Sequence, residues 1–297
     1  NEHLIGESVL YVSLEPCAHF GKTPPCADLI IRHRIPRVVI GCRDPFTEVN
    51  GKGIDKLRAA GIDVIAGVLE NECRALNKRF FTFHTAHRPY IILKWAQSVN
   101  GITGNIGNDR MHISNAYTNR LVHKWRSHEA AILVGTNTAR LDDPSLTTRL
   151  WPGKNPIRLA VDMNLVLPHH LQLFDNAVPT VVFNSKLNTI ASFDHLKDTP
   201  GKTWYYQVTI DVSIVHQIVN ALYQLNVQSV LIEGGTKLLQ SFIDEGMWDE
   251  ARVITNEALL VAEGIKAPVL NAHRIIKTGE IFSDRVVYYS NTQFNLL

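Results

Sequence analysis

The first part of this 297-residue chain alternates short apolar runs with helical runs, and this alternation constrains the fold more than any other feature of the sequence. Residues 9–14, 37–41 and 63–68 are apolar runs of strand length. A helical pattern follows each run, beginning near Ala27, Ile54 and Glu70. Alternation of this kind predicts an α/β fold, in which helices cover a mostly parallel sheet.

A second series of strands and helices begins after a boundary near residues 84–89. Its first strand, residues 89–96, places Tyr90, Ile92, Lys94 and Ala96 on one face by the period of two. Further strands are expected at residues 130–134, 157–161, 179–183 and 230–232, with residues 251–255, 277–282 and 285–290 as antiparallel additions at the sheet edge. We therefore expect two domains, residues 1–86 and 87–297.

Composition excludes several classes of protein. The chain is 45% hydrophobic and 20% charged, which is ordinary for a globular protein. Its net charge of +2 and its lack of a polybasic run argue against a nucleic-acid surface. No apolar run is long enough to span a bilayer. The four cysteines are unevenly spaced and do not form a disulfide framework, so a reducing cytoplasm is the expected location.

Two of the cysteines stand a short loop apart in the motif Glu15-Pro16-Cys17-Ala18-His19-Phe20-Gly21-Lys22-Thr23-Pro24-Pro25-Cys26. Cys17 follows a predicted strand, and Cys26 begins a predicted helix whose N-terminus favours a thiolate. The arrangement resembles the zinc-binding half of cytidine-type deaminases, which take a third ligand and a catalytic glutamate from an upstream H-x-E motif. The sequence contains no H-x-E, so we expect the other half of the site to lie upstream of Asn1. The residues alone are also compatible with buried structural cysteines.

A glycine-rich turn follows the predicted strand 230–232, with the sequence Glu233-Gly234-Gly235-Thr236 before a helical run. Glycines allow close backbone approach, and a helix N-terminus offers N–H donors, so this turn is typical of a phosphate cradle. It lacks the spacing of the Walker and G-x-G-x-x-G fingerprints. Two other residues stay open between alternatives: Asp44 as a turn former or a substrate contact, and Arg126 as an exposed cation or a phosphate contact.

The order of motifs resembles one family over essentially the whole chain. The motifs are S-L-E-P-C-x-H-x-G-K-T-P-P-C, V-V-I-G-C-x-D-P, R-P-Y-I-x-L-K, D-D-P-x-L-T-x-R and E-G-G-T. They are similar to those of the bifunctional riboflavin-biosynthesis enzymes, in which a diaminohydroxyphosphoribosylaminopyrimidine deaminase is fused to a 5-amino-6-(5-phosphoribosylamino)uracil reductase. The resemblance implies part of a cytidine-deaminase-like domain followed by a dihydrofolate-reductase-like domain that uses NADPH.

The resemblance also implies roles for individual residues, carried over motif by motif. Cys17 and Cys26 match zinc ligands, and His19, Lys22 and Thr23 match the loop that contacts the deaminase substrate. Positions that match substrate contacts of the reductase are Lys94, Arg126, Leu146, Arg149 and Glu233. Positions that match cofactor contacts are Ala96, His112, Thr138, Asp142, Gly235, Thr236, Lys237, Leu238, Leu239, Gln240 and Ser241. His112 departs from the aromatic residue that the family often has there.

The chemistry implied for the reductase is hydride transfer from NADPH to the C1′ carbon of a ring-opened ribosylamine, which turns a ribosyl group into a ribityl group. Lys94, Asp142 and Glu233 are candidates to orient the sugar or to deliver the proton. The resemblance also implies one Zn²⁺ per intact deaminase domain. With two ligands and no H-x-E, we expect the deaminase to be inactive in this chain.

Two alternatives remain at the level of sequence: an enzyme that is only a reductase, and a non-catalytic protein that binds pyrimidines. The ligand-binding motifs fit each of them. In every case the expected partners are small phosphoribosyl pyrimidines rather than nucleic acids or membranes, and we expect the chain to form a homo-oligomer.

Overall fold

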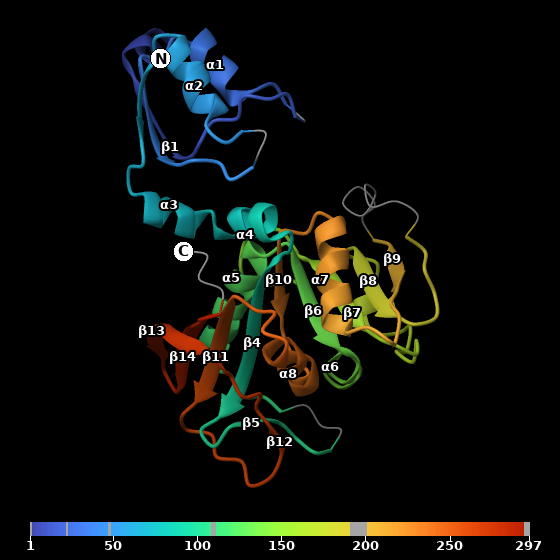
Figure 1. Cartoon of the computed structure of the whole chain (residues 1–297). Coiled ribbons are helices and arrows are strands. Elements are labelled where there is room, and N and C mark those ends of the chain that lie inside the picture. The colour runs from blue at the N-terminus through green and yellow to red at the C-terminus, as the bar shows by residue number, and fades with distance from the viewer. Residues whose placement is uncertain (1, 22, 47–48, 108–110, 191–200, 294–297) are drawn as a thin grey trace. The chain divides into compact units, whose positions relative to one another are not determined.

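A computed structural model describes residues 2–21, 23–46, 49–107, 111–190 and 201–293 of the chain (Figure 1). The described residues form two compact units, one ending at His87 and the other beginning at Arg88. Within these described ranges, no helix combines the length and the apolar character needed to cross a membrane.

The first unit is built on a three-stranded sheet of order β1-β2-β3, and both strand pairs are parallel. The strands are β1 (Val9–Leu14), β2 (Arg37–Cys42) and β3 (Asp63–Ala66), and a 3-10 helix, η1 (Glu2–Glu7), precedes them. The helices are α1 (Cys26–Arg32), α2 (Lys52–Ala59), α3 (Glu70–Leu76) and α4 (Lys78–Ala86). The parallel α/β organisation predicted from the alternating pattern is confirmed.

The two faces of this sheet are covered differently. Apolar residues of α1 and α2, such as Ile30 and Leu57, pack with Val38 and Ile40 of β2 in one buried cluster. Helix α3 packs against β2 at Gly41, where a methyl group would overlap the Cys73 sulfur. Gly41 therefore allows a closer approach of helix and strand than any side chain would permit.

The second unit contains a nine-stranded sheet of order β13-β14-β11-β4-β10-β6-β7-β8-β9 (Figure 1). Its strands are β4 (Tyr90–Ser98), β6 (Ala131–Gly135), β7 (Ile157–Val161), β8 (Thr180–Asn184), β9 (Thr203–Gln207), β10 (Ser229–Ile232), β11 (Glu250–Asn256), β13 (His273–Ile281) and β14 (Asp284–Asn291). The helical elements are α5 (Ala116–His128), α6 (Thr136–Asp142), η2 (Gln172–Phe174), α7 (Ile214–Gln224) and α8 (Thr236–Asp244). Short strands β5 (Ile102–Gly104) and β12 (Ile265–Lys266) pair separately.

One prediction about the tail was wrong. Residues 251–255 were expected as an antiparallel addition, but β11 runs parallel to β4. The reason is that α8 lies between β10 and β11 and returns the chain to the starting edge of the sheet, as a crossover helix does. Strands β13 and β14 are antiparallel, as expected.

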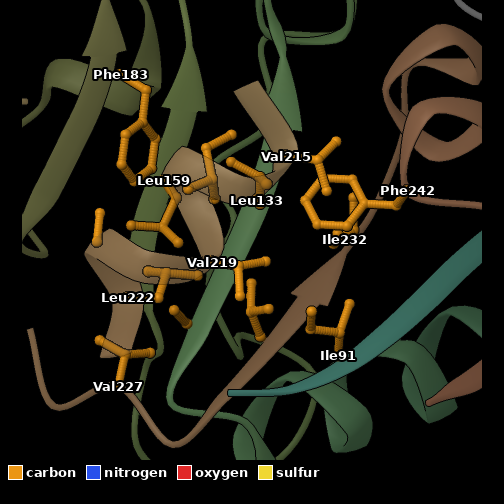
Figure 2. Packing of buried hydrophobic residues seen from close by; sticks show 14 of the residues in the cluster. Ile91, Leu133, Leu159, Phe183, Val215, Val219, Leu222, Val227, Ile232 and Phe242 are labelled. Atoms are coloured by element: carbon orange, nitrogen blue, oxygen red, sulfur yellow. The ribbon is translucent and has the colours of Figure 1, made fainter. Parts of the chain in front are cut away.

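Side chains alternate between the two faces of the sheet in the second unit. Ile91 and Leu93 of β4 join the cluster formed with α7 and α8, which includes Leu222 and Phe242 (Figure 2). Tyr90, Ile92 and Ala96 face the opposite side, where they pack with Val122 and Trp125 of α5. The predicted shared face of Tyr90, Ile92 and Ala96 is therefore confirmed.

The direction of the central strands indicates where a ligand site is expected. Strands β4, β10 and β6 are parallel neighbours, so the loops that leave their carboxyl ends open at the same edge. That edge is the usual place for ligands in open α/β sheets.

At the other end of β4, Arg88 donates two hydrogen bonds to Asp249, of 2.6 and 2.7 Å, and this buried pair joins the start of β4 to the start of β11.

Candidate functional site

A buried ion pair lies at the carboxyl edge of the central strands. Arg126, near the end of α5, donates through Nε and Nη2 to the two carboxylate oxygens of Glu233, at 2.8 and 2.6 Å. The two side chains are 11% and 5% exposed. Arg126 Nη1 also donates to the carbonyl oxygen of Thr147, at 3.1 Å. The pair thus joins α5, the turn after β10 and the loop after α6.

Lys94 completes this charged cluster from β4. Burial disfavours the carboxylate of Glu233, but the positive charges of Arg126 and Lys94 outweigh it and hold the pKa of Glu233 below its usual value. The structure therefore brings together Lys94, Arg126 and Glu233, three residues predicted from separate segments of the sequence. Glu233 is an ionised hydrogen-bond acceptor at neutral pH.

The turn after Glu233 has a backbone that favours glycine. Gly234 and Gly235 have φ angles of +133° and +75°, and no side chain caps the first N–H groups of α8, which begins at Thr236. A methyl group at Gly234 would lie 3.2 Å from Thr138 Cγ2 on α6. A glycine turn that leads into an uncapped helix start is a feature typical of phosphate cradles.

The remaining cofactor positions predicted on α8 differ in accessibility. Leu239 is 1% exposed and lies in the hydrophobic core, with Leu238 packed against it. Gln240 donates to Asp244 at 2.7 Å, and Ser241 donates to the Leu238 carbonyl at 2.8 Å. The first turn, from Gly235 to Lys237, is therefore the part of this segment that is suited to a ligand.

Other predicted cofactor positions lie on separate elements. Thr138 is on α6, Asp142 is the last residue of that helix, and Ala96 is on β4. His112 is exposed in the segment before α5. Its contact with a cofactor stays a prediction.

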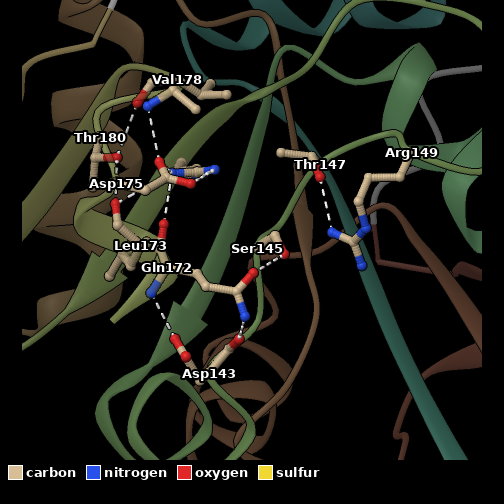
Figure 3. A network of polar contacts seen from close by, with 11 residues as sticks. Asp143, Ser145, Thr147, Arg149, Gln172, Leu173, Asp175, Val178 and Thr180 are labelled. Carbon is tan, nitrogen blue, oxygen red and sulfur yellow. Dashed lines mark hydrogen bonds and ion pairs between the residues drawn. The ribbon is translucent and has the colours of Figure 1, made fainter. Parts of the chain in front are cut away.

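The loop of residues 143–149 follows α6 and has an unusual backbone. Asp143 and Leu146 have φ angles of +37° and +52°, a region that costs about 1–3 kcal/mol for residues other than glycine and persists only where the surroundings enforce it. Leu146 is 1% exposed and packs with Ile132 and Val134, so its side chain belongs to the core. Arg149 is exposed and donates to Thr147 Oγ1 at 2.9 Å (Figure 3).

His123 was missed by the sequence reasoning. It is 6% exposed on α5, and its Nδ1 accepts a hydrogen bond of 3.4 Å from the backbone N–H of Leu150. Burial and the positive charges of Arg126 and Arg149 lower its pKa to about 4, so it is neutral at neutral pH. Its position three residues before Arg126, on the same side of one helix, is the signal that identifies it.

In the first unit, the predicted metal residues lie beside a cavity. Cys26 begins α1, and its backbone N–H donates to Cys17 Sγ at 3.3 Å. Burial, followed by the hydrogen bond and charge of Cys17, raises the pKa of the Cys26 thiol. A cavity of about 610 Å³ is lined by residues that include Cys17, Cys26 and His19. Thr23 is exposed in the same loop, and Lys22 lies outside the described residues.

The cysteine pair does not fit a complete zinc site. Among the residues that the structure describes, no group of three or more histidine, cysteine or acidic side chains is arranged to hold a metal ion. A zinc site needs at least three protein ligands, and Cys17 and Cys26 provide two thiols.

Glu15, the first residue of the motif, was given no role from sequence, yet it organises the cavity wall. Its carboxylate accepts backbone N–H groups of Asp44, Gly51, Gly53 and Ile54, at 2.9 to 3.2 Å. Glu15 thus holds the loop after β2 and the start of α2 in place.

Asp44 accepts the N–H of Phe46 at 2.8 Å, in the manner of a turn former. Burial raises the pKa of Asp44. Asp44 also lines the cavity, where a substrate contact stays a prediction.

Comparison with known proteins decides the family. Residues 89–262 match the RibD C-terminal domain. This chain belongs to the RibD family. The riboflavin biosynthesis protein RibD of Aquifex aeolicus is 38% identical over 282 residues, covering 94% of this chain and 77% of that protein. RibD of Bacillus amyloliquefaciens is 37% identical over 245 residues, covering 81% of this chain and 65% of that protein.

Two solved structures share the fold over almost all of the chain. The Thermotoga maritima protein described as a diaminohydroxyphosphoribosylaminopyrimidine deaminase/5-amino-6-(5-phosphoribosylamino)uracil reductase is 31% identical, with a TM-score of 0.82, covering 95% of this chain and 79% of that one. Acinetobacter baumannii RibD is 27% identical, with a TM-score of 0.83, covering 98% and 82%. The family predicted from the order of motifs is confirmed.

The buried, neutral state of His123 predicts a pH dependence of stability. Its pKa is about 4 in the folded protein, against about 6.5 when unfolded. The unfolded state therefore binds more protons between these values, so the His123 contribution is complete above about pH 6.5 and decreases as the pH falls toward 4. All five tryptophans lie after Arg88, so their fluorescence reports on unfolding of the second unit. The His123→Gln variant should show a flatter dependence than wild type in this window, and parallel curves would contradict the assignment.

Proposed function

We propose that this chain is a riboflavin-biosynthesis reductase that converts 5-amino-6-(5-phosphoribosylamino)uracil to its ribityl product with NADPH. The observation that carries the proposal is the convergence of Lys94, the Arg126–Glu233 pair and the Gly234-Gly235 turn at one edge of the sheet. Membership of the RibD family and the reductase description of the T. maritima protein support it.

The Gly234-Gly235 turn fits the diphosphate of NADPH. Both glycines have positive φ angles, no side chain caps the start of α8, and the hydroxyl of Thr138 on α6 lies beside the turn, which together suit the segment to an anion. NADPH, when bound, supplies the hydride for C1′. The protein binds NADPH and the substrate and aligns them with each other, and this positioning is the main contribution that such a reaction needs from the protein.

The charged cluster fits the other reactant. Contacts with Glu233 and Thr147 use three of the five N–H groups of Arg126, which leaves two that can donate to a ligand. Glu233 holds the guanidinium in one orientation. Arg149 supplies an exposed cation from the neighbouring loop for the 5′-phosphate.

Of the three candidates for proton delivery, we favour Lys94 and Asp142 over Glu233. Glu233 is ion-paired and its pKa lies below the usual value, so it is a poor proton donor. Lys94 and Asp142 remain as candidates. The charge of Lys94 acts on Glu233, which places Lys94 in the charged cluster.

For the first unit, we infer that residues 1–86 are the C-terminal part of a deaminase domain and that residues 87–297 are the reductase domain. A deaminase that also contained an H-x-E motif would hold one Zn²⁺ through Cys17 and Cys26. In this chain we propose that deamination does not occur. We further propose small phosphoribosyl pyrimidines as partners, a cytoplasmic location and a homo-oligomeric state.

The placement of NADPH is tested at Gly235. Asp at this position introduces a negative charge where a diphosphate would bind, so Gly235→Asp should weaken NADPH binding. Gly235→Asn is the matched control, because it has the same shape and tolerates a positive φ without the charge. Calorimetry should give a larger Kd for the Asp variant than for the Asn variant. Equal affinities in two folded variants would move the diphosphate elsewhere.

The role of Arg149 is tested by kinetics. Loss of a charge-assisted contact costs about 1.5–3 kcal/mol, or about 10- to 150-fold in affinity. Arg149→Ala should therefore raise the KM for the phosphoribosylaminouracil by a factor in this range and leave the KM for NADPH nearly unchanged. Arg274→Ala, at an exposed cation on β13, serves as the control. A selective rise in the NADPH KM would assign Arg149 to the cofactor instead.

The division of activities is tested by supplying each substrate separately to the purified chain. We expect NADPH oxidation with the deaminated substrate and no deamination of the diaminohydroxypyrimidine precursor, with well under one zinc bound per chain. General acid/base assistance alone is worth about 10²- to 10⁴-fold, and the nucleophilic water also depends on the metal. Zinc-dependent deamination would refute the proposal that the first unit is inactive. A folded chain that binds the pyrimidine without oxidising NADPH would favour the non-catalytic alternative.

A further inference from the structure

A single glutamine outside every sequence motif makes several contacts with the loop that carries Arg149. The backbone N–H of Gln172 donates to Asp143 Oδ1 at 2.7 Å, and its side-chain Nε2 donates to the Asp143 carbonyl at 2.9 Å (Figure 3). Its Oε1 accepts the hydroxyl of Ser145. Both ends of the side-chain amide are thus engaged by residues of one loop.

We propose that Gln172 is a positioning residue of the reductase site, which holds the loop of residues 143–149 in the conformation that presents Arg149 to the substrate. This inference rests on the proposed reductase function and adds to it a residue that contacts neither reactant. The loop needs such a support, because Asp143 and Leu146 both have positive φ angles on either side of Ser145.

Gln172 is itself fixed to the sheet. It begins η2, and its carbonyl accepts a hydrogen bond of 2.9 Å from Arg158 Nη1 on β7. The Arg158 side chain is fully buried and pairs with Asp175 at 2.6 Å. Leu173 of η2 packs in the same cluster as Leu146 of the loop. Hydrogen bonds and apolar packing therefore connect β7 to η2 and η2 to the loop.

The far end of the loop is held by other residues. Thr148 donates through its N–H and its hydroxyl to Asn155 Oδ1, each at 2.9 Å. His123 accepts the Leu150 N–H at 3.4 Å. With Gln172 at the near end, these contacts leave Arg149 on a segment anchored at both sides.

The alternative is that Gln172 only adds to the stability of the fold. Its side chain is exposed and touches the loop rather than the core, so it should contribute little to global stability. A positioning role instead predicts a local change in the loop and a change in substrate KM that depends on Arg149.

The test is Gln172→Met, which keeps the length of the side chain and removes the amide. Loss of neutral hydrogen bonds worth about 0.5–1.5 kcal/mol corresponds to about a 2- to 12-fold rise in substrate KM. The KM for NADPH should stay close to wild type, and the unfolding midpoint should fall no further than it does in Gln217→Met. Gln217→Met is the matched control, because Gln217 makes a similar set of bonds to Thr209 and Val212 on another part of the same unit.

Two measurements decide the proposal. In the Arg149→Ala background, Gln172→Met should add no further rise in substrate KM, whereas independent, additive effects would overturn the proposal. Hydrogen exchange of the peptide covering residues 143–149 should be faster in Gln172→Met than in wild type and Gln217→Met. This second readout needs no activity, so unchanged exchange would overturn the positioning role even if the reductase function failed.

Discussion

The bidentate contact between Arg126 and Glu233 is the interaction on which the candidate site depends. A buried carboxylate and a buried guanidinium are each costly alone, and removing one partner of such a pair typically costs about 3–5 kcal/mol. Here the two partners come from α5 and from the turn after β10, and the same guanidinium reaches the carbonyl of Thr147. Because neither charge is stable alone, the pair holds three segments together: α5, the turn after β10 and the loop after α6. The glycine turn adjoins Glu233 and the Arg149 loop contains Thr147, so the pair also helps to place both of them.

Arg126 and Glu233 neutralise each other before any ligand binds. Arg126 and Glu233 were predicted as two separate ligand contacts, but in the structure each is first the partner of the other. Lys94 adds a second positive charge, so the cluster of two cations and one carboxylate is net positive. Because Glu233 already holds the guanidinium in one orientation, Arg126 loses less side-chain entropy on binding a ligand than an unpaired arginine would.

The sequence was sufficient for the α/β class, for most strands and for the motif residues that meet at the carboxyl edge, because alternation and glycine turns are local signals. It was insufficient where the outcome depends on distant partners. The parallel direction of β11 depends on the crossover through α8, and the burial of Leu146 and Leu239 depends on which face each side chain meets. Glu15, His123 and Gln172 form hydrogen bonds with backbone groups of other segments. A short sequence motif contains no information about such distant partners.

The position of β4 between β10 and β11 has a consequence for synthesis of the protein. Strand β4 is the first strand of its unit, yet its neighbours in the sheet come from the last third of the chain, and its buried contact between Arg88 and Asp249 spans 161 residues. Because non-local pairing must wait for both partners, the second unit cannot complete its central sheet on the ribosome until β11 has emerged. The first unit has only short-range strand pairs and carries no such delay. Until β10 and β11 have emerged, apolar β4 stays without its neighbours, and in this interval a nascent chain of this topology is most exposed to aggregation and to chaperones.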